Sequence, residues 1–500
     1  MIKSKNKLAR NGQAEVRVGD YSFDQTNYSN SYLAITRGRF TLPLQDDPFA
    51  LKYEIWLVTD QQFKTSLDEL AQKKSGIKTR TFSEKIDDFS KEEPQKQIEE
   101  KNNTDIDIKS LEGKAILYSG LFKNFPHIQK SVVLFDCEKG NEYFVNSEGT
   151  SIRKPVNKFK LEVVATAIDK KGNRYSDYVN FFADGLNSLP TDSEVEKAIN
   201  DLAKRMELIL KAPFAEDYAG PVLFKNEASA NFFSQVLSKS LSGKPAMLSQ
   251  GATASQLLRK LGRKIMPDFI SIVDDPLIEE YNGKKLIGSY KIDDEGVKAQ
   301  KINIVDSGVL KNLLMCRKPT AKVKSSNGHG RKGLNKRVDA RPSNVIVTSS
   351  QSKSYDELKS DFLKMCKEMD LEYGLMVKRM SDVTPFYNYV ESFSSLMPSG
   401  KSNELFVSYP LEVYKVYVKD GREELVKGCN FANLSLKSLK DITAMGNDPF
   451  VFNHENKGAS GDLPTSFVAP SFIIDDMEIN AEKDQNKRPP MMKNPCFSNK

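Results

Sequence analysis

The most constraining feature of this sequence is the spacing of its apolar residues between positions 131 and 183. Apolar and polar residues alternate here, in the runs SVVLFDC, EYFVNS, KFKLEVVATAID and RYSDYVNFFA. The turn-forming stretches EKGN, SEGT and KKGN separate these runs. A period of two places successive side chains on opposite faces of a sheet, and short glycine-containing connections join neighbouring strands as hairpins. The pattern therefore predicts an antiparallel sheet.

One helix is predicted before this sheet in the sequence and another after it. Asp47-Pro48 precedes an apolar run that ends near Gly76, which is typical of a helix with an aspartate N-cap and proline at its first position. The second helix is predicted from residue 192 to residue 211, with Ser193 and Glu196 as a capping box. Between the first helix and the sheet, residues 83–110 are dense in charge and poor in large apolar side chains. We expect an exposed or partly disordered connection there.

Strand patterns return in the second half of the chain, in DFISIVDD, NVIVTSS, LEYGLMVKRM and SFIIDDMEI. Asp420-Gly421 lies between two alternating runs and predicts a hairpin. Residues 354–369 are predicted to form a helix. The fold class is therefore α+β. An N-terminal α/β domain, residues 1–212 with the charged insertion at about 83–110, precedes a mostly antiparallel β C-terminal domain, residues 213–482, and a Pro/Lys-rich tail, residues 483–500.

Composition restricts the classes of partner. The net charge is +7, from 74 basic and 67 acidic residues, and this small excess does not indicate nucleic acid. The basic segment 308–338 is interpreted as a solvated loop rather than an anion site. Five scattered cysteines without a CxxC pair favour reduced thiols. No apolar run is long enough to span a membrane, so the chain as written is expected to be cytoplasmic. If an upstream signal peptide is missing, we expect a periplasmic or exported protein.

A second informative stretch is VLFKNEASANFFSQVL, residues 222–237. Its apolar residues predict an amphipathic helix over residues 228–241, with Ala230, Phe233, Val236, Leu237 and Leu241 as the core stripe. Asn226 precedes this helix and is a candidate N-cap. Asn226, Glu227 and Asn231 also stand where a zinc-binding helix would carry its functional groups. Because carboxamide oxygens are poor zinc ligands, we favour a structural helix over a metal site.

Few other residues are candidates for chemistry. The three histidines, His127, His329 and His454, lie in separate segments, and none is part of an HExxH motif. His329 lies in SNGHGRKG, where flanking glycines would expose it beside Arg331 and Lys332. A glycine-hinged surface loop is the alternative interpretation.

The acidic residues Asp293, Asp294 and Glu295, which precede Gly296, are candidates for a cation site. Consecutive residues of a strand point to opposite faces, which favours a turn instead. SLMPSGKS, residues 395–402, is similar to a P-loop but lacks its first glycine, so we interpret it as a flexible turn.

Several motifs occur together in an order that resembles the C-terminal domain of the TldD/PmbA family, also called modulators of DNA gyrase. They are GPVLF with its helix, GRKIMPDFISIVDDP, GSYKIDDEGVKAQKINIVDSGVLKNLLM, SNGHGRKG and RPSNV. The resemblance runs from about residue 220 to residue 436. It implies an α/β N-terminal domain, a barrel-like and mostly antiparallel C-terminal domain, and paired subunits that degrade small or unfolded peptides.

The resemblance also implies a zinc site in the TldD type, formed by an HExxxH helix and a later cysteine. In this sequence Asn226 and Asn231 take the two histidine positions, Glu227 keeps the glutamate, and SGDLPTSFVAPSF contains no cysteine. The chain is therefore similar to the PmbA type, also called TldE, which lacks the motif.

We predict a non-catalytic subunit without metal or other cofactor. It would form a homodimer, or a heterodimer with a TldD-type subunit, around a peptide substrate, with no nucleic acid and no membrane as partner. Two alternatives remain open. One is an active metal-dependent peptidase that uses Glu227, His329 and Asp294, and the other is a gyrase- or nucleic-acid-linked regulator.

Overall fold

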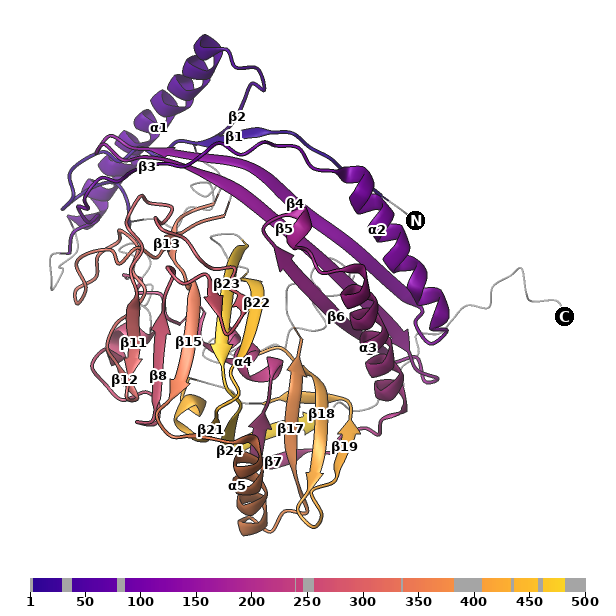
Figure 1. Cartoon of the computed structure of the whole chain (residues 1–500). Coiled ribbons are helices and arrows are strands. Elements are labelled where there is room, and N and C mark those ends of the chain that lie inside the picture. The colour runs from indigo at the N-terminus through magenta and orange to yellow at the C-terminus, as the bar shows by residue number, and fades with distance from the viewer. Residues whose placement is uncertain are drawn as a thin grey trace, which may run out of the picture.

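The computed structural model describes residues 3–28, 38–78, 86–238, 240–245, 256–333, 336–381, 407–432, 436–456 and 462–481. Within them the chain is an α+β protein with a long arched sheet over a β-rich C-terminal region (Figure 1). The near-P-loop at 395–402 and the tail at 483–500 lie outside the described residues. No helix among the described residues is long and apolar enough to cross a membrane.

The alternating segment forms the arched sheet. Strands β4 (Lys130–Val145), β5 (Ser151–Ile168) and β6 (Arg174–Ala183) are antiparallel, and β3 (Lys96–Ile98) runs parallel to the start of β5. The SEGT and KKGN turns are confirmed, but the turn predicted at EKGN is wrong. Strand β4 continues through it, with Gly140 paired to Val156. Pairing with β5 along the whole of β4 overrides the local turn preference, because sheet formation depends on partners distant in sequence.

The two faces of the arched sheet have different neighbours. The face with Leu161, Val163 and Ala165 packs against α2 (Ile108–Leu121) and α3 (Asp192–Lys211). On the opposite face, Val164 and Tyr178 pack against Leu411 of the C-terminal region. Ion pairs join this face to the C-terminal region, from Lys154 to Asp294 and from Lys160 to Glu455. The sheet is therefore buried on one side by its own helices and on the other by the C-terminal half of the chain.

The predicted helix at 192–211 is confirmed as α3, but its predicted capping box is wrong. The N-cap is Thr191, whose Oγ1 accepts a hydrogen bond from the Glu194 backbone N–H at 3.3 Å. The Glu194 carboxylate accepts from the Thr191 backbone N–H at 2.8 Å. Ser193 lies inside the first turn, where its side chain cannot reach the free N–H groups ahead of it.

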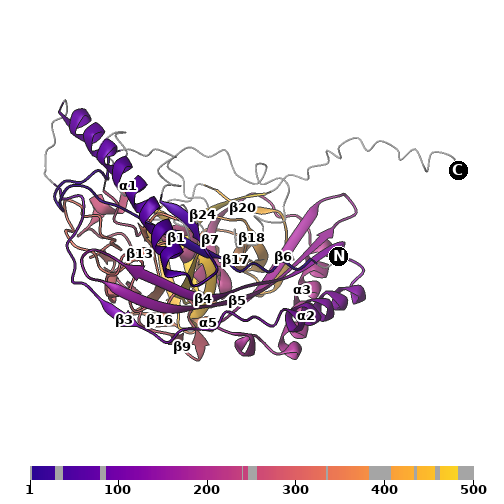
Figure 2. The ribbon, with the colours of Figure 1, turned by 90° about the horizontal axis from the view of Figure 1, so that it is seen from above.

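The first predicted helix is confirmed as α1 (Pro48–Ile77), with Asp47 as its N-cap. It lies beside the short strands β1 (Arg10–Gln13) and β2 (Arg39–Leu42) and projects beyond the arch (Figures 1 and 2). The prediction of an exposed connection after α1 is wrong for part of residues 86–110. Asp88 and Ser90 are buried there, and β3 joins the sheet. Asp88 is retained inside because its carboxylate pairs with Lys73 of α1.

Two larger sheets form the C-terminal region. The six-stranded sheet contains, in spatial order, β12 (Val309–Leu310), β11 (Ile302–Asp306), β8 (Ile270–Asp274), β15 (Asn344–Ser349), β23 (Leu463–Ala469) and β22 (Phe450–Asn456). The eight-stranded sheet contains β16 (Ser352–Lys353), β21 (Ile442–Gly446), β24 (Phe472–Ala481), β7 (Tyr218–Phe224), β17 (Tyr373–Met380), β18 (Pro410–Tyr417) and β19 (Glu423–Val426), with β20 (Cys429–Phe431) on β24. Two-stranded ribbons are formed by β9 (Glu280–Tyr281) with β10 (Lys284–Lys285) and by β13 (Gly330–Arg331) with β14 (Asp339–Ala340). Most of these pairings are antiparallel.

Several local predictions for this region are confirmed. The Asp420-Gly421 turn joins β18 to β19, with Gly421 at φ 69°. The helix at 354–369 is α5 (Tyr355–Glu368), with Ser354 as its N-cap. The barrel-like expectation is not confirmed, because both sheets are open along the described strands. The domain boundary at residue 212 stays a prediction.

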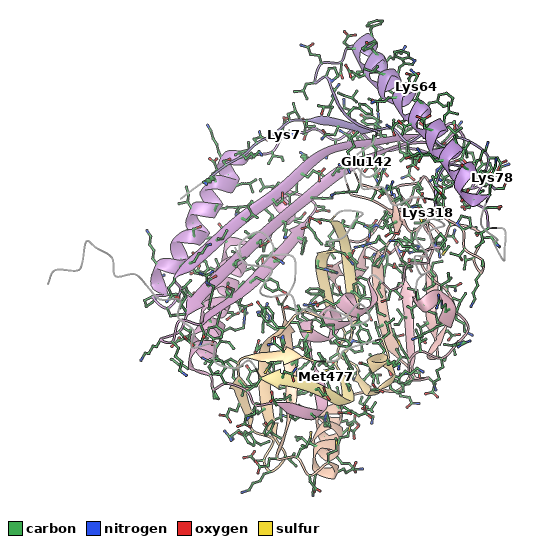
Figure 3. The ribbon with its side chains drawn as sticks, turned by 180° about the vertical axis from the view of Figure 1, so that it is seen from behind. Lys7, Lys64, Lys78, Glu142, Lys318 and Met477 are labelled. Atoms are coloured by element: carbon green, nitrogen blue, oxygen red, sulfur yellow. The ribbon has the colours of Figure 1, made fainter. Side chains whose placement is uncertain are left out.

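The helix α4 (Glu227–Leu237) lies between the C-terminal sheets and contacts β17, β22 and β23. The predicted core stripe is buried, although the helix ends at Leu237. Aromatic rings fix it in place: Phe224 stacks on Phe472 with centroids 4.8 Å apart, and Phe232 packs against both. Figure 3 shows the molecule from behind, with Glu142 on the arch and Met477 in the eight-stranded sheet. The position of α4 therefore depends on the core of the C-terminal region.

Candidate functional site

The start of α4 faces strand β6 of the arched sheet. A turn from Lys225 to Ala228 opens the helix, with Asn226 at φ 54° and ψ −127°. Asn226 occupies the N-cap position as predicted, but its side chain makes no capping hydrogen bond and is exposed. Its positive φ directs the side chain away from the free N–H groups of the first turn, whereas an ordinary N-cap has extended backbone.

Glu227 joins the two halves of the protein. Its Oε1 accepts a hydrogen bond from the Tyr178 hydroxyl at 3.1 Å, and its Oε2 lies 3.1 Å from Arg379 Nε. Arg379, at the end of β17, also contacts Asp177 Oδ1 at 2.5 Å and the Tyr178 carbonyl at 3.0 Å. Asp177 Oδ2 accepts from Arg205 Nε of α3 at 2.8 Å. A continuous network therefore runs from α3 through β6 and β17 to the first residue of α4.

The charges of this network balance. Burial acts to raise the pKa of the Asp177 carboxyl, but Arg379 and Arg205 outweigh burial and hold it below its ordinary value. Burial acts to lower the pKa of Arg379, but Asp177 and Glu227 raise it well above its usual range. These two groups therefore remain charged and paired at neutral pH. Glu227 is bound by a guanidinium and a phenol, one at each carboxylate oxygen.

Asn231 continues the polar stripe of α4 and is almost completely buried. Its Nδ2 donates to the carbonyl oxygens of Met380 and Ser381 at 3.3 and 3.5 Å, and its Oδ1 accepts from Gln235 Nε2 at 2.7 Å. Gln235 in turn accepts a hydrogen bond from the Ser408 backbone N–H at 2.6 Å. Both ends of the Asn231 carboxamide are therefore occupied by protein partners.

These residues do not fit a zinc ion. Zinc in catalytic sites requires three converging nitrogen, sulfur or carboxylate ligands and one open position. Asn231 is saturated, Asn226 points into solvent and Glu227 is held by Arg379. No three His, Cys, Asp or Glu side chains converge among the residues that the structure describes. The four described cysteines are free, and burial raises the pKa of Cys316 to about 12, so this thiol is not a ready thiolate ligand.

The acidic residues 293–295 form the predicted turn, closed by a hydrogen bond from Gly296 N–H to the Asp293 carbonyl at 3.1 Å. Each carboxylate has a different partner. Asp293 accepts from the backbone of Glu295, Val297 and Gly330, Asp294 pairs with Lys154 at 2.9 Å, and Glu295 accepts from the Arg317 backbone at 2.6 Å. Burial and the neighbouring Glu295 raise the pKa of Asp293 well above its usual range. The three carboxylates do not converge on a common cation position.

His329 is completely buried, so its predicted exposure is wrong in both interpretations. Its Nδ1 lies 3.0 Å from the Asn327 carbonyl, and its Nε2 lies 3.5 Å from Asp274 Oδ1. The loop therefore turns inward, and its imidazole lies beside Asp274, which is also buried. Glu227, His329 and Asp294 therefore contact three different sets of partners and do not form the alternative catalytic set.

The basic segment 308–338 is only partly the predicted solvated loop. Lys311, Lys322, Lys324 and Arg337 are exposed, but Arg317 and Arg331 are buried. Arg331 donates to the carbonyl oxygens of Pro342 and Pro464, at 2.5 and 2.9 Å. The two buried guanidiniums therefore bind the protein itself.

A buried histidine was not anticipated as part of this region. His454 Nε2 lies 2.8 Å from Ser234 Oγ on α4, and both side chains are buried. Burial, with a smaller contribution from Arg341, lowers the pKa of His454 to about 3. The imidazole is therefore neutral in the folded protein at neutral and mildly acidic pH.

Acidification is expected to destabilise the protein through His454. The unfolded chain binds a proton near pH 6.5 and the folded chain does not, so stability present above this pH is lost as pH falls toward 3. The loss at pH 5 is about 2 kcal/mol. The free energy of unfolding, measured with urea, should therefore fall between pH 7.5 and pH 5. This fall should be smaller by about 2 kcal/mol in His454→Gln than in the unchanged chain. Parallel pH profiles for the two proteins would contradict this assignment.

Sequence reasoning found α4 and its polar positions but missed their partners. Arg379, Asp177 and Tyr178 lie in strands that contain no recognisable motif. The one available signal was Gln235, which lies one helical turn after Asn231 and two turns after Glu227. That spacing predicts a continuous polar stripe on an otherwise buried helix.

The described residues thus form a two-part α+β protein in which a buried helix meets the arched sheet through an ion network. The domain described as "PmbA/TldA metallopeptidase C-terminal domain" matches residues 217–481, more than half of the 500 residues. The chain belongs to this family of PmbA/TldD metalloprotease-like proteins, as its motifs predict.

Individual relatives support the same assignment. A metalloprotease of Methanothermobacter thermautotrophicus is 27% identical over 323 residues, which cover 64% of this chain and 63% of that protein. The chain thus spans less than two thirds of the length of the first curated relatives that it matches.

Two crystal structures share the fold. A putative modulator of a DNA gyrase from Thermotoga maritima has a TM-score of 0.54 at 17% identity, covering 88% of this chain and 86% of that one. TldE from Thermococcus kodakarensis has a TM-score of 0.53 at 14% identity, covering 89% and 88%. At these identities the likeness shows the fold alone.

Proposed function

We propose that this chain is a metal-free, TldE-like subunit that serves a peptide-degrading assembly without itself cleaving peptides. The observation that supports this proposal best is the state of the three α4 positions. Glu227 is neutralised by Arg379, and the Asn231 carboxamide is consumed by Met380, Ser381 and Gln235. A general base must be able to receive a proton, and a metal ligand must present a lone pair, so neither role suits these side chains.

The role proposed for α4 is to hold the two halves of the subunit together. The network from Arg205 to Glu227 links the arched sheet to the C-terminal sheets at the same place where a catalytic subunit would keep its reactive groups. The assembly would be a homodimer, or a heterodimer in which a TldD-type subunit supplies the metal. The substrate class is a small or unfolded peptide.

The metal content of the purified chain tests this proposal. Protein prepared without chelator and without a histidine tag should contain far less than one zinc per chain by inductively coupled plasma mass spectrometry. One zinc per chain would overturn the proposal, and its loss in Glu227→Gln or His329→Ala would assign the ligands. As a control, peptide cleavage by a mixture with a TldD-type subunit should be the same with Glu227→Gln as with the unchanged chain.

A further inference from the structure

A cluster of cations surrounds one carboxylate near the start of the chain. The Glu15 carboxylate lies 3.0 Å from the Arg17 guanidinium, and the Glu15 side chain is 58% exposed. Arg17 lowers the pKa of the Glu15 carboxyl, and Lys318, Lys332 and Arg337 lie close enough to lower it further. We call Arg17, Lys318, Lys332 and Arg337 the Glu15 cluster. Cations from two distant parts of the chain therefore face one carboxylate that is open to solvent.

Two guanidiniums stacked on one aromatic ring hold the cluster in place. The Cζ atoms of Arg17 and Arg317 each lie 3.8 Å from the centroid of the Phe89 ring. One face of a phenyl ring accommodates one guanidinium at this distance, so the two lie on opposite faces. Arg317 is fixed in turn by Glu148, whose carboxylate oxygens accept from its Nη1 and Nη2 at 2.5 and 2.6 Å. Lys318 therefore follows a rigidly held residue.

The other cations of the cluster are positioned by contacts within the basic segment. Lys318 Nζ donates to the Val338 carbonyl at 3.3 Å, which places it beside the residue that follows Arg337. The Lys332 backbone N–H donates to Asp294 Oδ2 at 2.7 Å, so its position depends on the acidic turn. Figure 3 shows Lys318 where the end of the arched sheet meets the C-terminal region. The cluster is therefore part of the contact between the two halves of the protein.

Most of the positive charge in the cluster is available to a further anion. Arg17 is already paired with Asp24, at 2.9 Å. Among the described residues, Lys318, Lys332 and Arg337 form no ion pair with a carboxylate. Like charges held close together repel one another, and an anion placed among them relieves this repulsion. The Glu15 cluster therefore has the charge of an anion-binding site.

The Glu15 side chain can leave the cluster without disturbing its backbone. The Ala14 N–H donates to the Gly38 carbonyl at 2.8 Å, and the Val16 carbonyl accepts from Ser66 Oγ at 2.9 Å. These contacts hold the chain on both sides of Glu15. An exposed side chain changes its rotamer within nanoseconds, so the Glu15 carboxylate is an exchangeable occupant of the cluster.

We propose that the Glu15 cluster binds the C-terminal carboxylate of a peptide, and that the Glu15 carboxylate occupies the same position when no peptide is bound. The chain's own carboxylate shows which chemical group the cluster accepts, through charge-assisted hydrogen bonds from guanidinium and ammonium groups. The choice of a peptide rests on the function proposed above, whose substrate is a small or unfolded peptide. Every unmodified peptide ends in one carboxylate, so this contact would not depend on peptide sequence.

A pair of peptides that differ only at the C-terminus tests the proposal on the full chain. Acetyl-trialanine carries one charge, the terminal carboxylate, and acetyl-trialanine amide carries none. Dissociation constants from NMR titration should show that the acid binds at least about tenfold more tightly than the amide. Added salt should weaken binding of the acid and leave the amide unchanged, because salt screens exposed charges.

Two substitutions locate the binding site of the acid peptide. Arg337→Met removes an exposed cation of the cluster and should weaken binding of the acid about tenfold or more. Lys318→Met should have the same effect and replaces Arg337→Met if that variant fails to fold. Lys311→Met is the matched control, since Lys311 is an exposed cation of the same basic segment outside the cluster and should leave binding unchanged.

A third substitution tests the competition with Glu15. Glu15→Gln should tighten binding of the acid peptide about tenfold, because it removes a tethered competitor and its negative charge. Arg17 keeps Asp24 as its partner in this variant, so the fold should be retained. Glu196→Gln removes an exposed carboxylate of α3 and is the matched control.

Three results would overturn the proposal. They are equal affinity for the acid and the amide, acid binding that Arg337→Met and Lys318→Met both leave unchanged, and inorganic phosphate that binds more tightly than the acid peptide. The last result would assign the cluster to free phosphate. Zinc content has no part in these measurements. One zinc per chain would overturn the proposed function alone, and equal peptide affinities would overturn this inference alone.

Discussion

Replacing Arg379 with methionine is expected to lower the free energy of unfolding by about 3–5 kcal/mol. The substitution removes the cation that Asp177 and Glu227 share, and both carboxylates are mostly buried, with side chains 8% and 19% exposed. Breaking a buried pair by removing one partner is costly because the other charge is left without compensation. Asp177 keeps Arg205, so Glu227 should account for much of the loss. Chemical denaturation of the purified chain measures the effect.

Two variants separate this mechanism from a general effect of losing an arginine. Arg422→Met removes an exposed guanidinium that lies 3.7 Å from Glu424, and exposed pairs contribute about 1 kcal/mol or less. Combining Glu227→Gln with Arg379→Met removes the uncompensated charge and should restore part of the lost stability. If Arg379→Met costs no more than Arg422→Met, the network does not hold the two halves together.

Replacing Lys73 with methionine is expected to release the N-terminal segment from α1. Lys73 Nζ is completely buried and donates to the carbonyls of Asp24 and Thr26 at 2.8 and 2.7 Å, and to Asp88 Oδ2 at 2.5 Å. Burial raises the pKa of the Asp88 carboxyl even though Lys73 acts against it. Without Lys73 this carboxyl can take up a proton, so the expected cost is roughly 3 kcal/mol.

Hydrogen exchange is the suitable measurement, because a detached segment can open without global unfolding. The Asp24 amide, which donates to Asp88 Oδ2 at 3.0 Å, and the Val18 amide, which donates to Gln25 Oε1 at 2.8 Å, should lose protection roughly a hundredfold. Lys64→Met on the same helix is the control, since Lys64 is 70% exposed and pairs with Asp60 of its own helix at 2.6 Å. Unchanged protection in Lys73→Met would show that the segment is held by its other contacts.

The candidate site illustrates how far sequence reasoning can reach. The apolar stripe predicted the helix, and the residue types at 226, 227 and 231 predicted that these positions suit zinc poorly, because ligand chemistry is a property of the residue type. The contacts that decide the role of Glu227 come from Tyr178 and Arg379, 49 and 152 residues away along the chain. No local pattern encodes such a pairing, so the ion network was not predictable.

For His329, the sequence led to a definite prediction that was wrong. Flanking glycines are typical of exposed loops, and the sequence around His329 therefore predicted a reactive surface residue. In the fold, Gly328 adopts φ 73° and the loop directs His329 toward the buried Asp274. Gly328 allows the backbone to approach Lys298 and Ala299 closely, and Gly330 allows it to approach the Asp293 and Glu295 carboxylates. Neither glycine determines the side on which the histidine lies.

The sequence by itself determined the elements whose causes are local. The alternating runs specify β5 and β6, Asp47-Pro48 specifies the start of α1, and Asp420-Gly421 specifies the β18–β19 hairpin. Each depends on residues a few positions apart, whose geometry is set by side-chain period, capping and turn preference. The ordered motifs of the second half also identified the family.

Only the tertiary structure decided which surfaces these elements present to one another. It carried β4 through EKGN, placed Glu227 against Arg379, and buried Lys73 of α1 while leaving Phe49 and Trp56 of the same helix exposed. Helical and strand periods indicate that an element has two unlike faces. The partner of each face depends on packing and on the pairing of buried charges across the chain. That choice is a property of the whole fold, which no short stretch of sequence contains.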